Sequence, residues 1–162
     1  LSRNEDGDGC EIIDSILSCD GTKSQSLILK KGGAKSPISH EVLEKKEQFV
    51  SMDGQVVFKN AVKTMSRHCA TLLERNNISK EEVDWFIPHQ ANLRIIETTA
   101  KLLDYPMEKV IVNVDKYANT SSASIPAALH EAFVDGRVKR GQTLLFAAFG
   151  AGLTSGAVLI KF

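Results

Sequence analysis

Apolar residues recur with the period of an α-helix in two separate parts of the chain, and a third helix is indicated by its end signals. Residues 52–75 repeat apolar side chains every three to four positions, which predicts a long helix with one apolar face. A second helix is expected over residues 89–103, where the same spacing recurs. A third is expected over residues 124–134, because Pro126 falls in its first turn and Gly136 lies just past its end.

Short apolar runs bounded by turn-forming residues predict the strands. The run VIVNV at residues 110–114 consists mostly of β-branched residues and is expected to form a central strand. Residues 26–30 are a weaker candidate for a strand, and residues 31–40 are expected to form a loop. The remaining predicted strands cover residues 11–18, 84–88, 143–149 and 157–162.

The order of these elements predicts an α/β fold. Strands and helices alternate along most of the chain, which favours a mostly parallel sheet covered by helices. The last two strands are joined by few residues, so we expect that pair to be antiparallel. The prediction is therefore a mixed five-stranded sheet covered by helices. The length of 162 residues suits one domain, and no linker, repeat or low-complexity segment divides residues 1–162.

The composition is that of an ordinary globular protein, with 43% hydrophobic and 25% charged residues. The formal net charge is zero and the isoelectric point is about 7.1. These values argue against a broad electrostatic surface for nucleic acid or an anionic membrane, but they allow a local basic patch. No apolar run approaches the roughly 20 residues of a membrane helix. The first residues lack the pattern of a secretion signal, so a cytoplasmic location is expected.

The cysteines and most histidines do not indicate a metal site or a disulfide framework. Cys10, Cys19 and Cys69 are an odd number without a CxxC spacing, and we interpret all three as structural. Three further histidines are interpreted as surface or boundary residues: His40, His68 and His130.

Three polar features follow predicted strands, where ligands collect in sheets of this kind. They are His89, Asn119 and the glycine-rich turn at residues 149–152, and each follows a different strand. Because such loops meet at one rim of a sheet, we expect the three features to lie close together.

Each feature has a structural and a chemical interpretation. A neutral His89 at a helix start, where the positive helix end disfavours the imidazolium, could donate a hydrogen bond to an oxyanion or enolate. It could equally be a helix-start residue with no further role. Asn119 could donate through its amide or serve as a turn residue. The turn Gly150-Ala151-Gly152 could bring backbone N–H groups close to an oxygen, or could only connect two strands.

Three segments around these residues resemble the β-ketoacyl-acyl carrier protein synthase III family. The most specific is DWFIPHQANLRII at residues 84–96, followed by YANTSSASIP at residues 117–126 and FGAGLT at residues 149–154. They occur in the order and spacing of the family, and the resemblance extends over nearly all of the chain. Ser155 departs from the family pattern, in which a tryptophan is common at this position.

The resemblance implies the C-terminal half of a thiolase-like fold and a condensing reaction. The family joins an acyl-CoA primer, often acetyl-CoA, to malonyl-acyl carrier protein and so starts fatty-acid synthesis, usually as a homodimer. A cysteine takes the acyl group, the malonyl thioester loses CO2, and the resulting carbanion attacks the acyl-cysteine. No cofactor is implied, because CoA thioesters and the phosphopantetheine of the carrier are substrates. No nucleic acid, membrane or metal is implied either.

The resemblance also assigns roles to individual residues. His89 and Asn119 correspond to the pair that holds the malonyl thioester carbonyl and stabilises the enolate as CO2 leaves. The backbone N–H of Ala151 corresponds to one donor of an oxyanion hole. The implied substrate and CoA channel includes Phe58, Asn92, Phe149, Gly150 and Gly152. The implied contacts to the acidic acyl carrier protein are Lys59, Arg94 and Lys101.

The nucleophile of the family has no counterpart in this sequence. In the family the acyl-accepting cysteine belongs to the N-terminal half, and this sequence begins, with Leu1, where the second half begins. We therefore expect residues 1–162 to be the C-terminal domain of a synthase and to be inactive alone. Two alternatives stay open. One is a non-catalytic module that binds acyl carrier protein or CoA, and the other is a related thiolase-fold synthase of secondary metabolism.

Overall fold

The fold is described for residues 9–162 by a computed structural model. Its strands are β1 (Glu11–Cys19), β2 (Leu27–Leu29), β3 (Val50–Met52), β4 (Trp85–Pro88), β5 (Thr143–Gly150) and β6 (Thr154–Lys161). Its α-helices are α1 (His40–Glu44), α2 (Gly54–Arg75), α3 (Leu93–Leu102), α4 (Val114–Tyr117) and α5 (Ser124–Val134). Short 3₁₀ helices lie at Gly21–Ser26, Lys80–Glu82, Met107–Lys109 and Ser121–Ala123.

Four strands form one mixed sheet in the order β1-β6-β5-β4. The pair β4 and β5 is parallel, whereas β5 with β6 and β6 with β1 are antiparallel. The predicted mixed sheet is therefore confirmed. The predicted five strands and the mostly parallel pairing are wrong, since within residues 9–162 this sheet has four strands and one parallel pair.

The predicted strand VIVNV does not form. The side chain of Gln90, and not a neighbouring strand, pairs with its backbone groups. Only Val110 makes a bridge, to Phe86. Beyond it, the side-chain amide of Gln90 donates to the carbonyl of Ile111 at 3.1 Å and accepts from the N–H of Asn113 at 2.9 Å. These are the backbone groups that a paired strand would use, so the segment leaves the sheet and continues into α4.

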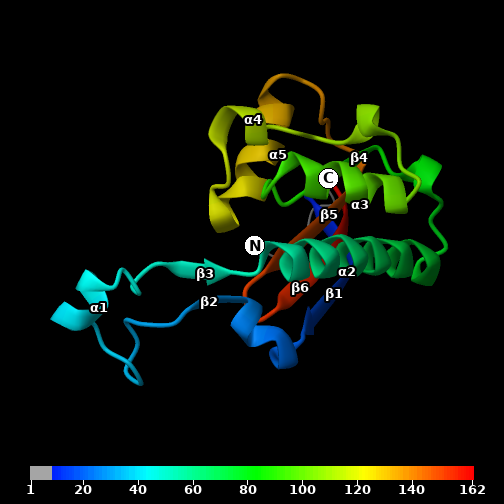
Figure 1. Ribbon diagram of the computed structural model, residues 1–162. Coiled ribbons are helices and arrows are strands. Elements are labelled where there is room, and N and C mark those ends of the chain that lie inside the picture. Colours follow the sequence, from blue (N-terminus) through cyan, green and yellow to red (C-terminus); the bar gives the residue numbers. More distant parts are fainter. Residues whose placement is uncertain (1–8) are drawn as a thin grey trace.

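Helices cover both faces of the sheet, because successive strand residues face opposite sides. Phe86 and Leu145 belong to a core shared with α2 and α3, whereas Ile87 and Leu144 belong to a core shared with α5. All four side chains are almost completely buried. The main body is thus a three-layer α/β/α arrangement with the long helix α2 lying along the sheet (Figure 1).

Residues 27–52 form an arm that projects from the main body (Figure 1). The short strands β2 and β3 pair antiparallel, and α1 lies at the far end of the arm. The sequence predicts a strand at residues 26–30 and a loop at residues 31–40, and β2 agrees with the former. Neither α1 nor β3 is predicted, since elements of five and three residues are too short to show a period.

Capping residues decide where the two long helices of the site begin. Asp53 caps α2 and Asn92 caps α3, each through a side-chain oxygen that accepts backbone N–H bonds. The helix α3 therefore begins at Leu93, later than the predicted start at residue 89. As a result His89 directly follows β4, where its backbone N–H donates to the backbone carbonyl of Ala147 at 2.8 Å.

Candidate active site

A large open cavity lies at the edge of the sheet where β4 and β5 end. Because these two strands are parallel, their carboxyl ends share one edge of the sheet. The cavity has a volume of about 1830 Å³, and its lining includes His89, Asn119 and the start of the turn after β5. The structure thus brings together the three features that the sequence singles out, although Asn119 follows α4 and not the predicted strand.

His89 is held at the cavity wall by Ser124, the first residue of α5. Its Nδ1 lies 2.5 Å from the Oγ of Ser124, a side chain that is 2% exposed. The same hydroxyl accepts the backbone N–H of Gln90 at 3.2 Å. Burial lowers the pKa of His89, which favours the neutral imidazole. The sequence predicts a neutral ring for another reason, a helix end, but α3 begins only after Asn92.

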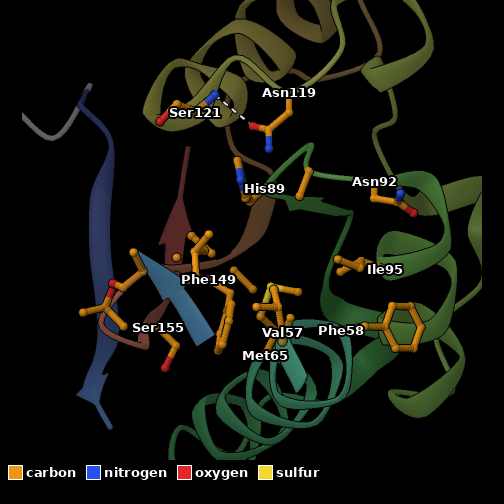
Figure 2. A pocket seen from close by; sticks show the side chains of 18 of the residues that line it. Val57, Phe58, Met65, His89, Asn92, Ile95, Asn119, Ser121, Phe149 and Ser155 are labelled. Carbon is orange, nitrogen blue, oxygen red and sulfur yellow. Dashed lines mark hydrogen bonds between the residues drawn. The ribbon is translucent and has the colours of Figure 1, made fainter. Parts of the chain in front are cut away.

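Asn119 is presented by a loop that directs its amide. Its Oδ1 accepts the N–H of Ser121 at 2.9 Å, which leaves Nδ2 as a donor. Figure 2 shows this amide nitrogen directed toward the side on which His89 lies. The flanking residues Ala118 and Ser121 have φ values of 55° and 56°, a region that non-glycine residues rarely adopt. A neutral imidazole and a primary amide therefore border the same space.

The turn between β5 and β6 borders the cavity on another side. Phe149, Gly150 and Ala151 line the cavity, and the carbonyl of Ala151 accepts the hydroxyl of Thr154 at 2.8 Å. Gly152 shapes the turn without being part of that lining. Its φ is 137°, and a Cβ there would lie 2.6 Å from Cγ2 of Thr154, so glycine is required.

Apolar side chains from α2 and α3 form the wall opposite these polar groups (Figure 2). They include Val57, Met65 and Ile95. Phe58 and Asn92 lie farther along the same wall, as Figure 2 shows, and both line the cavity. The arrangement suits an elongated, partly apolar molecule that carries a carbonyl oxygen at the polar end.

The three predicted carrier contacts are only partly brought together. Arg94 lines the cavity at the start of α3, and its guanidinium lies 5.6 Å from the ring centroid of Phe58. Lys59 on α2 and Lys101 on α3 are exposed and are not part of the lining. Arg94 lies in the first turn of α3, where its positive charge is close to the positive end of the helix dipole. No acidic residue in that turn compensates for it. An anion bound nearby would offset this unfavourable placement.

Gln90 and Ser124 organise the site, although the resemblance to the family assigns a role to neither of them. Gln90 is fully buried, and its amide donates to two backbone carbonyls and accepts from two backbone N–H groups. Ser124 connects the exit of β4 to the start of α5. Both residue types are common in loops and at helix starts, so only their burial and partners distinguish them.

His68 is not at the surface or boundary, as its sequence context suggests, but is 5% exposed. Its Nε2 lies 3.0 Å from the Oγ of Ser155, the residue that departs from the family pattern. Burial raises the pKa of the Cys69 thiol to about 12, so this cysteine is a poor nucleophile. Cys10 and Cys19 are exposed thiols outside the cavity lining.

Within residues 9–162, no group of three or more His, Cys, Asp or Glu side chains is placed to hold a metal ion. In the same part of the chain, no helix has both the length and the apolar character needed to cross a membrane.

Solved structures with the same arrangement define the class of protein. The 3-oxoacyl-[acyl-carrier-protein] synthase III from Aquifex aeolicus VF5 aligns with a TM-score of 0.85 and 40% identity, over 99% of this chain and 47% of that chain. The synthase III from Thermus thermophilus aligns with a TM-score of 0.83 and 35% identity, over 100% of this chain and 49% of that chain. The fold is therefore a thiolase-like α/β fold, as the resemblance implies.

Sequence comparison defines the family. The family model for the C-terminal part of 3-oxoacyl-[acyl-carrier-protein (ACP)] synthase III matches residues 73–162. The β-ketoacyl-[acyl-carrier-protein] synthase III of Koribacter versatilis is 46% identical over 100% of this chain, and that of Aliarcobacter butzleri is 49% identical over 93%. This chain belongs to the 3-oxoacyl-[acyl-carrier-protein] synthase III family. It spans about half the length of these relatives, 49% and 45% respectively.

Proposed function

We propose that these residues act as the C-terminal half of a condensing enzyme. The enzyme joins an acyl-CoA primer, such as acetyl-CoA, to malonyl-acyl carrier protein by decarboxylative Claisen condensation and so starts fatty-acid synthesis. The observation that carries this proposal is the meeting of His89, Asn119 and the Ala151 turn in one cavity. The relatives named above are synthases of this name, which supports the same conclusion.

His89 and Asn119 supply the hydrogen-bond donors for decarboxylation. When the bond to the malonyl carboxylate breaks, CO2 leaves and the electron pair moves toward the thioester oxygen, which becomes an enolate oxygen. The Nδ2–H of Asn119 and an N–H of the neutral His89 ring stabilise that developing charge. Because both donors are uncharged, they do not stabilise the starting carboxylate as a cation would.

The acyl-accepting thiol of the proposed reaction comes from outside residues 1–162. Cys69 is buried, and Cys10 and Cys19 do not line the cavity. Once the acyl group is on such a thiol, the enolate carbon attacks its carbonyl to form a tetrahedral oxyanion, and its collapse breaks the C–S bond and releases the cysteine thiolate. The backbone N–H of Ala151, at the cavity rim, is placed in this proposal as one donor to the resulting oxyanion.

The carrier would deliver its phosphopantetheine between α2 and α3. Phe58 and Asn92 line that approach, and Arg94 lies at its mouth, where it would contact the acidic carrier. Lys59 and Lys101 would extend the basic surface on the same two helices. The CoA thioester and the carrier arm are substrates here, so the proposal invokes no cofactor. The resemblance to the family supports a homodimer in the cytoplasm.

Replacing the two donors tests the proposal in the protein of its natural length. In His89→Ala and in Asn119→Ala, CO2 release from malonyl-acyl carrier protein should fall roughly 10²- to 10³-fold, the effect of losing an oxyanion donor. Acyl transfer from acyl-CoA to the enzyme should continue, because it precedes the decarboxylation. His130→Ala is the matched control, since His130 is an exposed histidine of α5 outside the cavity lining.

Three outcomes would contradict parts of the proposal. Unchanged CO2 release in either variant would remove the assigned role of that residue. Binding of carrier or CoA without acylation or decarboxylation would favour a non-catalytic module. A condensation product other than a β-ketoacyl thioester on the carrier would favour a related synthase of secondary metabolism.

A further inference from the structure

The hydroxyl of Ser124 has two hydrogen-bond partners among the described residues, and the chemistry of one of them fixes the direction of its bond. The backbone N–H of Gln90 can only donate, so the Oγ accepts it at 3.2 Å. The other partner is Nδ1 of His89 at 2.5 Å. A serine hydroxyl has one hydrogen to donate, and this one makes no further hydrogen bond to the described residues. Donation of this hydrogen to Nδ1 is therefore the arrangement that satisfies the hydroxyl within the described residues.

We propose that Ser124 is a positioning residue that keeps the ring proton of His89 on Nε2. A neutral imidazole carries one proton, so a ring whose Nδ1 accepts must be protonated at Nε2. Within residues 9–162, Nε2 makes no hydrogen bond, and the ring lines the cavity. Its N–H is thus available to a ligand oxygen. The catalytic use of this N–H rests on the proposed function, in which it binds the thioester oxygen.

The surroundings of Ser124 hold its hydroxyl in place. Its side chain is 2% exposed, and it begins α5, whose Ala128 and Ala132 are completely buried in the core beneath the sheet. The stretch of chain from the end of α4 to Ser124 also contains Asn119. One stretch of chain therefore positions the amide donor and orients the imidazole donor, so a shift of this stretch would affect both donors.

The ring proton can be located by nuclear magnetic resonance on the natural-length protein with ¹⁵N-labelled histidine. Long-range ¹H–¹⁵N correlations distinguish the two nitrogens of a neutral ring, and the signals absent from His89→Gln identify His89. We expect Nε2–H in the unchanged protein, a mixture or Nδ1–H in Ser124→Ala, and a return to Nε2–H in Ser124→Thr. Ser155→Ala is the matched control. It removes the serine partner of His68 and should leave the His89 signals unchanged.

Decarboxylation gives a second readout. In Ser124→Ala it should slow by roughly 10- to 100-fold, as when a residue that fixes a histidine tautomer is removed from other sites. Ser124→Thr should recover much of this loss. Finding Nδ1–H in the unchanged protein, or Nε2–H fully retained in Ser124→Ala, would overturn the inference. If the unchanged protein does not decarboxylate malonyl thioesters, the proposed function fails, whereas the ring proton still decides the role of Ser124.

Discussion

Gln90 holds together the chain segments that carry the two proposed donors. It directly follows His89, and its Nε2 donates to the carbonyls of Pro88 at 2.8 Å and Ile111 at 3.1 Å. Its Oε1 accepts two backbone N–H groups at the start of α4, the helix that leads to Asn119. Because the side chain is fully buried, water does not replace these bonds when the amide is removed.

Replacing Gln90 with methionine should therefore destabilise the fold strongly. Methionine keeps the length of the side chain but cannot pair with the backbone groups, and a buried group left unpaired costs about 1–3 kcal/mol. We expect the free energy of unfolding, measured with urea, to fall by about 3 kcal/mol.

Gln142→Met is the control for this variant. Gln142 is only half-buried, and its amide oxygen accepts one bond, from the N–H of Lys139 at 2.7 Å. Its loss should cost about 1 kcal/mol or less. If Gln90→Met lowers the free energy of unfolding no more than Gln142→Met does, Gln90 does not hold these segments together through its four hydrogen bonds.

The sequence reveals the residues that carry chemistry better than it reveals their partners. His89 can be found because it follows a strand, where ligands collect in such sheets, and Asn119 because it lies in a segment that resembles the family. Ser124 cannot, because a serine before a helix has many ordinary uses. His68 is misjudged because it is buried and its hydrogen-bond partner, Ser155, lies far away in the chain. Local patterns contain no information on such contacts.

Among the elements, the connection between α4 and α5 carries backbone strain. Ala118 has φ 55° and ψ −160°, a combination that is almost restricted to glycine. Such a residue costs on the order of 1–3 kcal/mol and persists only where its surroundings impose it. It lies directly before Asn119, so the strain occurs where the chain must aim a side chain into the cavity.

Ala118→Gly should stabilise the protein by about 1 kcal/mol. This is the relieved strain of about 1–3 kcal/mol minus the extra unfolded-state entropy of glycine, about 0.5–1 kcal/mol. Decarboxylation should slow at the same time, because a freer backbone aims the Asn119 amide less firmly. Urea unfolding and CO2 release measure the two effects.

Ala127→Gly, at an exposed position inside α5, should change the stability in the opposite direction from Ala118→Gly. Glycine in a helix interior costs about 1 kcal/mol relative to alanine, so this variant should lose stability. If Ala118→Gly is destabilised to the same extent as Ala127→Gly, the backbone at Ala118 is not strained.

Long elements follow from the sequence, whereas short ones depend on their neighbours. The periodic pattern predicts α2 because several helical turns repeat it, and α5 is predicted from Pro126 in its first turn and Gly136 past its end. The run VIVNV has the composition of a strand, yet the Gln90 amide competes for its backbone groups and only Val110 pairs. Composition favours a strand there, but a single buried side chain decides the outcome.

For the whole molecule, topology explains why the position of the site could be anticipated. The parallel pair β4 and β5 is enough to place His89 and the turn after Gly150 at one edge of the sheet, although the other pairs are antiparallel. On the opposite wall, the resemblance anticipates Phe58 and Asn92 but not the apolar residues of α2 and α3 beside them. Val57 and Met65 of α2 occupy positions on an apolar helix face, and the sequence cannot separate core from cavity lining.

Although the chain has zero net charge, a positive side chain lies at the edge of the cavity. Arg94 lies at the N-terminal end of α3, where the helix dipole disfavours a positive charge. Its guanidinium packs on the ring of Phe58 and remains exposed. A cation kept in a place that is unfavourable for stability indicates an anionic partner, and the proposed carrier protein is acidic.

Arg94→Glu tests this interpretation without endangering the fold, because glutamate is favourable at a helix start. We expect the Kd for acyl carrier protein to rise about tenfold, equivalent to about 1.4 kcal/mol. The Kd for CoA should change less. Because added salt screens exposed charges, carrier binding should also depend less on ionic strength in the variant.

Arg140→Glu separates a specific contact from a change in net charge. Arg140 also packs on a phenylalanine, 4.6 Å from the ring centroid of Phe162, but it does not line the cavity. The variant Arg140→Glu introduces the same charge reversal away from the cavity. Carrier binding should therefore stay near its original value. Equal losses of carrier and CoA affinity in Arg94→Glu would point instead to a contact with the pantetheine or phosphate part common to both ligands. An equal effect of both arginine variants on carrier binding would show that only the total charge matters.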